Sequence, residues 1–246
     1  MRSMIYPSGL FIGVWDKYMT KRVIKNIMWD VDGVLANLDH AYYRFLTEHD
    51  NYKEQYKNLK FEKLAEALPI AEEFGALELT THPTLGERFN HDFCHHSGDI
   101  YFDRPLFPGV VDLLKGFNQK GYFQLTMSAG FDKTIKAKMI ADTLGAELSF
   151  IHIEVVEHVK SKSGHRNAMV GEKEARILEC LDKYQLNAEE TLLVDDRIFN
   201  CKTGLKIGMQ VLRPLWAITT PAPIELGITE VKTIAEFKSW MDDHTV

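Results

Sequence analysis

The stretch that decides the fold is Asn26-Ile27-Met28-Trp29-Asp30-Val31-Asp32-Gly33-Val34-Leu35, an apolar run that ends in two carboxylates and a glycine. Alternate side chains of a strand point the same way, so we expect Asp30 and Asp32 to share a face at a strand's C-terminal end. Two carboxylates facing one place repel each other, unless a divalent cation lies between them or one of them holds a proton. Gly33 lets the backbone turn away without a Cβ. Taken alone, the stretch could also be a strand that ends in an ordinary surface Asp-Gly turn.

The chain on either side of this stretch alternates between strand and helix patterns. Apolar runs predict strands at 23–30, 122–130, 149–155, 191–196 and 209–212. Helical periodicity predicts helices at 110–119, 132–144, 172–184, 200–206 and 234–242, the last one capped by Thr233. Residues 157–170 are polar and basic, and we assign them little regular structure. This alternation predicts an α/β fold with a doubly wound parallel sheet.

One part of the chain departs from the alternation. From 39 to 103 the apolar residues recur only at helical spacing, interrupted by Pro69 and Pro83. We therefore divide the chain into a leading segment (1–22), an α/β core (23–38 and 104–246) and an inserted all-helical domain (39–103).

Composition and charge narrow the function to small-molecule chemistry. With 246 residues, 45% of them hydrophobic, the chain can bury a sizeable core. A net charge of -6 without a basic run argues against a nucleic-acid surface, and no apolar run reaches the length of a membrane span. The cysteines Cys94, Cys180 and Cys201 stand at unrelated spacings, which is typical of reduced thiols. We expect a cytoplasmic monomer or homodimer that binds neither nucleic acid nor membrane.

Further polar side chains follow other predicted strands. Ser128 stands at the end of the strand 122–130, and Asp195 and Asp196 end the strand 191–196. In doubly wound sheets ligands bind beyond the carboxyl ends of the strands. We therefore expect these side chains to meet Asp30 and Asp32 at one edge of the sheet.

The order and spacing of these groups resemble the haloacid dehalogenase superfamily of phosphatases and phosphotransferases over residues 23–213. Asp30-Val31-Asp32-Gly33-Val34-Leu35 resembles the first motif, and Ser128 the second, with Thr126 as the rival position. Asp195-Asp196, with Asn200 four positions on, resembles the fourth motif. The third motif supplies a lysine, for which Lys173 fits best and Lys160 and Lys162 are the alternatives.

The resemblance implies a magnesium-dependent phosphatase that acts on a small phosphorylated metabolite through an aspartyl-phosphate. Asp30 is the implied nucleophile, and Asp32 the acid that protonates the leaving alcohol and then the base that activates water. Ser128, Lys173 and the backbone amides of Gly33 and Ala129 bind the phosphoryl group. Mg²⁺ is held by Asp30, the carbonyl of Asp32 and Asp196, with Asp195 and Asn200 orienting these ligands. The helical insertion is implied to be a mobile cap.

Other functions share the same core. A sugar phosphomutase and a non-catalytic binding module that keeps the fold remain alternatives, although three intact aspartates disfavour the latter. A haloalkanoate dehalogenase needs neither Asp32 nor Asp196, and no cap lysine stands in the apolar setting that a phosphonate hydrolase needs. The run His91-Asp92-Phe93-Cys94-His95-His96 permits a zinc site, but a second ligand pair at characteristic spacing is lacking.

Overall fold

The computed structural model describes residues 23–77, 92–93, 104–130, 132–157 and 167–244. The leading segment 1–22 lies outside the described residues, and so do Cys94, Lys160, Lys162 and residues 78–91 of the insertion. Of the run 91–96, only Asp92 and Phe93 are described. No helix within the described ranges is long and apolar enough to cross a membrane.

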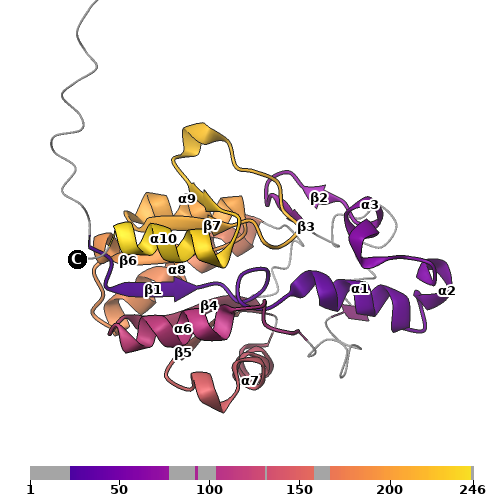
Figure 1. Cartoon of the computed structure of the whole chain (residues 1–246), viewed down its shortest axis with the longest axis horizontal. Helices are drawn as coiled ribbons and strands as arrows, with labels where there is room; N and C mark the ends of the chain where they lie inside the picture. The colour runs from indigo at the N-terminus through magenta and orange to yellow at the C-terminus, as the bar shows by residue number, and fades with distance from the viewer. Residues whose placement is uncertain (1–22, 78–91, 94–103, 131, 158–166, 245–246) are drawn as a thin grey trace, which may run out of the picture.

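A six-stranded sheet forms the centre of the core (Figure 1). Its strands are β1 (Asn26–Trp29), β4 (Phe123–Gly130), β5 (His152–Glu157), β6 (Thr191–Val194), β7 (Gln210–Pro214) and β8 (Thr229–Val231). They lie in the order β5-β4-β1-β6-β7-β8, and every neighbouring pair is parallel. The chain thus builds the sheet outward first on one side of β1 and then on the other, so the predicted doubly wound fold is confirmed.

Helices cover both faces of this sheet. The helices are α6 (Val110–Gln119), α7 (Lys133–Leu144), α8 (Asn167–Lys183), α9 (Ile198–Ile207) and α10 (Ile234–Asp243). Buried side chains of α6, α7 and α10 pack with Ile27 and Trp29 of β1, whereas those of α8 and α9 pack with Met28. Because successive strand residues point to opposite faces, the two helix groups lie on opposite sides of the sheet. Short 3-10 turns stand at Ala146–Leu148, Ala188–Glu190 and Ile224–Leu226.

The central strand β1 is buried at every position, as an apolar run in a parallel sheet requires. The ring of Trp29 stacks on that of Phe237, with 5.5 Å between the centroids, and its indole nitrogen donates to Gln124 Oε1 at 3.1 Å. An indole N–H that is buried needs such an acceptor. These contacts fix the strand that carries Asp30 at its end.

The insertion is helical in its first part but not throughout. It contains α1 (Leu38–Glu48), α2 (Lys53–Tyr56), a 3-10 turn (Phe61–Lys63) and α3 (Leu64–Ala67), which share a small hydrophobic core. The strands β2 (Ile70–Ala71) and β3 (Ala76–Leu77) then form an antiparallel hairpin. The prediction of an all-helical segment is wrong at this hairpin, which the pattern around Pro69 does not reveal.

Two further boundaries differ from the prediction. Helix α8 begins at Asn167, five residues before the predicted start at 172, inside the stretch to which we assigned little regular structure. Strand β8 was not predicted, because it is a three-residue edge strand with only one buried side chain. The cap of the last helix at Thr233 is confirmed, since its hydroxyl accepts a hydrogen bond from the amide of Glu236 at 3.1 Å.

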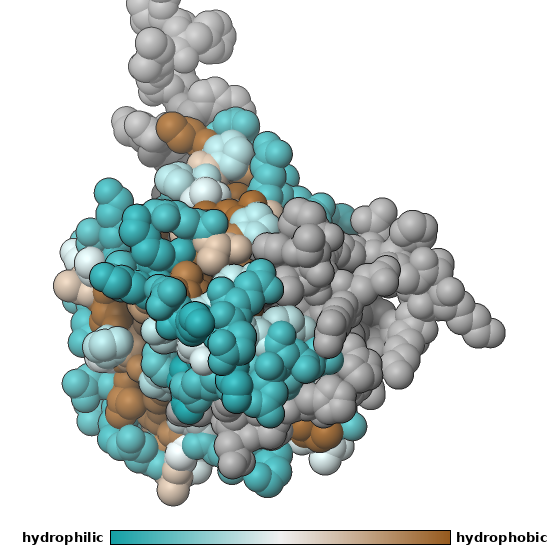
Figure 2. Space-filling view, turned by 90° about the vertical axis from the view of Figure 1, so that its right-hand side faces the viewer, coloured by the Kyte–Doolittle hydropathy of each residue, from teal (hydrophilic) through white to brown (hydrophobic). Residues whose placement is uncertain are grey.

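The surface seen from the side of the insertion is mostly hydrophilic, with smaller hydrophobic areas between (Figure 2). The large hydrophobic side chains that the described residues expose stand on separate elements. They are Phe61, Ile135, Leu178 and Ile224.

Glu154 of β5 gives the fold a pH dependence that can be measured. Burial opposes its ionisation, but hydrogen bonds from Lys183, Tyr184 and Arg176 outweigh burial and lower the pKa of Glu154 to about 2. A lowered pKa stabilises the folded state above the unfolded pKa, and this contribution is lost as pH falls towards the folded pKa. We expect Glu154→Gln to reduce the free energy of unfolding most above about pH 4.5, and progressively less towards about pH 2.

Denaturant unfolding at several pH values measures this difference. Glu147→Gln is the control, because Glu147 is exposed and pairs with Lys115 at the surface, where an ion pair contributes little. A cost of Glu154→Gln that stays constant with pH would contradict the assignment.

Candidate active site

Three buried carboxylates meet at the switch point of the sheet. Asp30 follows β1, and Asp195 and Asp196 follow the neighbouring strand β6. One oxygen of each carboxylate lies within 4.8 Å of the others, and all three residues are buried. The sequence predicted this convergence, because parallel strands end at the same edge.

Asp195 is held by several donors. It binds Lys173 Nζ at 2.5 Å, Asn200 Nδ2 at 3.0 and 2.9 Å, and the amide of Arg197 at 2.9 Å. Both of its carboxylate oxygens are thus occupied by protein donors. This arrangement suits a residue that positions the site better than one that supplies a free ligand atom.

Asp196 has the opposite character. Its Oδ1 is buried and has no hydrogen-bond partner among the described residues, whereas its backbone carbonyl accepts from Arg213 Nε at 2.6 Å. A buried carboxylate oxygen without a partner is costly unless a cation binds it. Oxygen donors are also the ligands that Mg²⁺ prefers, so Asp30 and Asp196 fit a magnesium site.

Lys173 connects the acids electrostatically. It lies in the interior of α8, and its buried Nζ is 3.5 Å from Asp30 Oδ1. Burial disfavours the lysine's charge, but Asp195 and Asp30 outweigh burial and raise the pKa of Lys173 to about 12. Of the three candidate lysines, the structure brings this one to the site, whereas Lys160 and Lys162 lie outside the described residues.

The pKa values of Asp30 and Asp196 are raised despite the positive charge of Lys173. Burial raises the pKa of Asp30 to about 7, Lys173 opposes this shift, and Asp195 and Asp32 add to it. Burial and the charge of Asp195 raise the pKa of Asp196 well above its usual range. A divalent cation at these oxygens would favour the ionised forms.

Ser128, rather than Thr126, has its hydroxyl available. Both residues are buried in β4, but Thr126 Oγ1 accepts a hydrogen bond from the amide of Glu154 at 3.3 Å. Ser128 Oγ is buried and finds no hydrogen-bond partner in the part of the chain that the structure describes. The preference for Ser128 over its rival position therefore has structural support. Ala129, the next residue of β4, is half-buried.

Gly33 is required by its backbone conformation and by its surroundings. Its φ is +80°, and a Cβ at this position would collide with the carboxylate of Asp196. A side chain here would therefore be strained and would displace Asp196. The turn after β1 and the turn after β6 thus touch at Gly33.

Asp32 is bound by two cations that the sequence analysis missed. Arg104 pairs with its Oδ1, and Lys136 Nζ lies 2.5 Å from its Oδ2. Burial alone would raise the pKa of Asp32, but Arg104 and Lys136 outweigh burial and hold that pKa below its usual range. Burial lowers the pKa of Lys136 to about 8, although Asp32 opposes this shift.

No sequence signal marks either cation, because Arg104 belongs to a loop and Lys136 to an ordinary helical pattern. Their role emerges only when the chain folds. The histidines of the run 91–96, which the sequence analysis considered as zinc ligands, lie outside the described residues.

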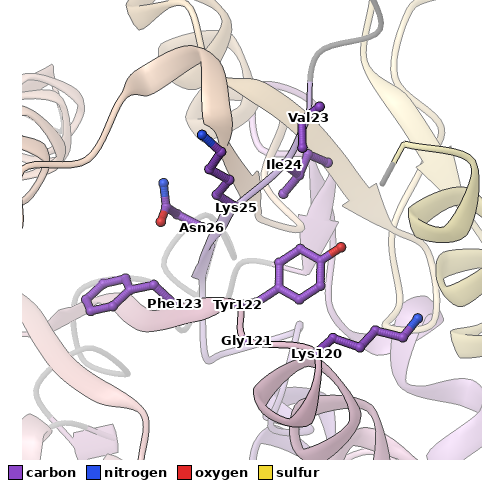
Figure 3. A pocket seen from close by; sticks show the side chains of 8 residues that line it. All are labelled: Val23, Ile24, Lys25, Asn26, Lys120, Gly121, Tyr122 and Phe123. Carbon is purple, nitrogen blue, oxygen red and sulfur yellow. The ribbon is translucent and has the colours of Figure 1, made fainter. Parts of the chain in front are cut away.

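A pocket of about 600 Å³ lies elsewhere, at the opposite ends of β1 and β4 (Figure 3). It is lined by Val23, Ile24, Lys25, Asn26, Lys120, Gly121, Tyr122 and Phe123. Its two lysines pair with Glu190 and Asp242 at the surface. The strand ends opposite to the carboxylates form this pocket, so it is separate from the candidate site.

Comparisons with known proteins agree with this geometry. The family profile of the haloacid dehalogenase-like hydrolases matches residues 24–208. A search of curated proteins found no match.

Solved structures share the fold at low sequence identity. A predicted phosphatase from Clostridium acetobutylicum is 12% identical, with a TM-score of 0.58 over 90% of this chain and 99% of that one. A haloacid dehalogenase-like family protein from Streptococcus pneumoniae is 16% identical, with a TM-score of 0.56 over the same shares. A hydrolase of this family from Deinococcus radiodurans, with bound phosphate and sodium, is 14% identical, with a TM-score of 0.55 over 91% and 97%.

Fold and site together define a doubly wound α/β hydrolase whose acids lie at the sheet's switch point. The chain belongs to the haloacid dehalogenase-like hydrolases.

Gly33→Ala tests the contact between the two acidic turns. The strain of a positive φ should lower the free energy of unfolding by about 1 kcal/mol, and the collision with Asp196 should weaken Mg²⁺ binding by about tenfold or more. Gly121→Ala is the matched control, because Gly121 has a φ of +82° with nothing within 4 Å of an added Cβ.

Calorimetric titration with MgCl₂ and denaturant unfolding measure the two effects. Equal Mg²⁺ affinity in both alanine variants would show that Gly33 does not shape the metal site.

Proposed function

We propose that this protein is a magnesium-dependent phosphomonoester hydrolase that acts through an aspartyl-phosphate on Asp30. The observation that carries the proposal is the meeting of Asp30 with Asp196 and with Lys173, whose Nζ lies 3.5 Å from Asp30 Oδ1. The neighbouring strand β4 carries Ser128, whose buried hydroxyl has no hydrogen-bond partner among the described residues. Those groups are what a transferring phosphoryl group requires, namely positive charge, a donor and metal ligands around an in-line nucleophile. No observation on the described residues favours a phosphomutase over a hydrolase.

In the first half of the reaction the carboxylate of Asp30 attacks phosphorus. The ammonium of Lys173, 3.5 Å from Asp30, offsets negative charge on the nucleophile and on the phosphoryl oxygens. The hydroxyl of Ser128 donates to one of these oxygens, together with the amide of Ala129. The amide of Gly33, which the sequence analysis also expected to bind the phosphoryl group, instead donates to the carbonyl of Ala36 at 2.9 Å. Asp30, the carbonyl of Asp32 and Asp196 would hold Mg²⁺, and the ion, when bound, would supply further positive charge near the phosphoryl oxygens.

Asp32 handles the protons in this scheme. As an acid it protonates the leaving oxygen, and as a base it takes a proton from the water that hydrolyses the aspartyl-phosphate. Its pairing with Arg104 and Lys136 favours the ionised form, which is the form needed for the second half. The first half requires that a bound substrate change these contacts.

Contacts of the hairpin β2–β3 support a role of the insertion as a cap. The amide of Ile198, next to the acidic turn, donates to the carbonyl of Phe74 at 2.8 Å, and the ring of Phe74 lies 5.0 Å from that of Phe199. The hairpin of the insertion is therefore in contact with the helix that follows Asp195 and Asp196. We propose that the insertion contributes substrate contacts and excludes water.

The nearest test is phosphate release from p-nitrophenyl phosphate with and without Mg²⁺. We expect release to require the metal, and Asp30→Asn to lower kcat by about 10³-fold or more, because the amide cannot attack phosphorus. Asp142→Asn is the control, since Asp142 is an exposed aspartate paired with Lys138.

Absence of turnover by the wild type with every metal tried would overturn the phosphatase assignment. Turnover by Asp30→Asn at the wild-type rate would remove Asp30 as the nucleophile.

A further inference from the structure

Lys136 is a second buried lysine at the edge of the sheet, on the other side of Asp32 from Lys173. Its side chain is 3% exposed, and its Nζ lies 2.5 Å from Asp32 Oδ2. Helix α7, capped by Asp132, places it one turn in from the helix start, where its amide donates to the carbonyl of Asp132 at 2.9 Å. The ammonium therefore reaches the site from an element that none of the four motifs includes.

The path of this side chain depends on a glycine. A Cβ on Gly130, the last residue of β4, would lie 2.9 Å from both Cβ and Cγ of Lys136. Real Cβ atoms do not approach other carbons so closely, so a larger residue would push the lysine away. The end of β4 thus gives the stem of Lys136 the space it needs to reach Asp32.

The charge of Lys136 is only partly neutralised. Asp32 carries a single negative charge and pairs with Arg104 as well as with Lys136. Lys136 makes no other ion pair with the residues that the structure describes. An ammonium has three donors, and the described residues supply one acceptor for them, Asp32 Oδ2. Burying a charge in this way is costly unless another acceptor completes the site.

The position of Lys136 indicates what that acceptor is. Lys173 lies beside Asp30, where the phosphoryl group is attacked, whereas Lys136 contacts Asp32, which faces the leaving group in the proposed mechanism. Atoms bound by Lys136 are therefore atoms of the leaving group. An anionic group on the leaving group would bind the ammonium through a charge-assisted hydrogen bond.

We propose that Lys136 determines specificity by binding a second anionic group, a carboxylate or a phosphate, on the leaving group of the substrate. The inference rests on the proposed function, because the proposed mechanism is what places the leaving group beside Asp32. It narrows the substrate class to phosphomonoesters of short acidic alcohols, in which the second anion is within a few bonds of the ester oxygen.

Non-hydrolysable analogues of equal length test the inference by binding alone. Calorimetry on the wild-type protein with Mg²⁺ would compare phosphonopropionate, which ends in a carboxylate, with propylphosphonate and aminopropylphosphonate, which end in a methyl and an ammonium group. We expect phosphonopropionate to bind at least about tenfold more tightly than propylphosphonate, and aminopropylphosphonate to bind most weakly. Ethylenebisphosphonate distinguishes a carboxylate from a phosphate as the second anionic group. If it binds more tightly than phosphonopropionate, the second group is a phosphate, and if it binds more weakly, the second group is a carboxylate.

The variants assign the preference to one side chain. Lys136→Met should abolish the preference for phosphonopropionate, while Lys136→Arg should retain part of it. Lys138→Met is the control on the same helix, because Lys138 is 79% exposed. If Lys136→Met fails to fold, Gly130→Ala takes its place, since it displaces the lysine without removing it.

Equal dissociation constants for phosphonopropionate and propylphosphonate in the wild type would overturn the inference, as would a preference that survives Lys136→Met. Failure of the proposed hydrolysis is seen separately, as absence of phosphate release from simple esters. The binding preference does not depend on turnover, so the two failures can be told apart.

Discussion

Mutual repulsion among Asp30, Asp32, Asp195 and Asp196 is the constraint on which the structure of the site depends. Three of these carboxylates are buried and the fourth is half-buried, all at one edge of the sheet. The fold answers the repulsion with cations from three elements, since Lys173 comes from α8, Lys136 from α7 and Arg104 from the segment that returns from the insertion. These three cations do not compensate the charges of Asp30 and Asp196 fully, and burial raises the pKa values of both carboxyl groups. A divalent cation bound between the carboxylates of Asp30 and Asp196 would supply the positive charge that the protein itself does not.

Arg213 holds the acidic turn to the rest of the molecule. This fully buried residue of β7 donates to the carbonyls of Asp196, Thr220 and Gly75 and pairs with Glu230. It therefore links the acidic turn, the hairpin of the insertion and the loop after β7 in a single network. Because a buried guanidinium is costly without all of its acceptors, the hairpin cannot leave this position without disturbing the backbone of Asp196. The position of the insertion and the geometry of the site are coupled through this residue.

The sheet and the acidic constellation were predictable from sequence because both depend on local patterns. A buried strand such as β1 reads as an apolar run, and a polar residue after such a run lies at the sheet edge whatever the details of packing. Hence the structure places Asp30, Asp195 and Asp196 together, as expected, and Ser128 near the end of the neighbouring strand β4. The roles assigned to them remain proposals, as do the limits of the insertion.

The features that the sequence did not reveal depend on contacts between distant segments. The hairpin 70–77 is held by Arg213, which stands more than a hundred residues later, and β8 is too short to carry a pattern of its own. Lys136 reads as one polar position of an amphipathic helix, and Arg104 as part of a loop. Only the folded chain shows that both side chains are buried against Asp32. The choice between Thr126 and Ser128 likewise depends on a contact between strands, because the amide of Glu154 in β5 donates to the hydroxyl of Thr126 in β4.

The central claim is that Asp30 carries the phosphoryl group during the reaction, and its most direct test is to trap that species. The protein would be mixed with a phosphomonoester and Mg²⁺, quenched in acid within one turnover, digested and examined by mass spectrometry. The account predicts one added phosphoryl group on the peptide that contains Asp30, located on that residue by fragmentation and absent from Asp30→Asn. Phosphate release without any phosphorylated peptide, or with the phosphoryl group on Ser128 or Asp195, would contradict it.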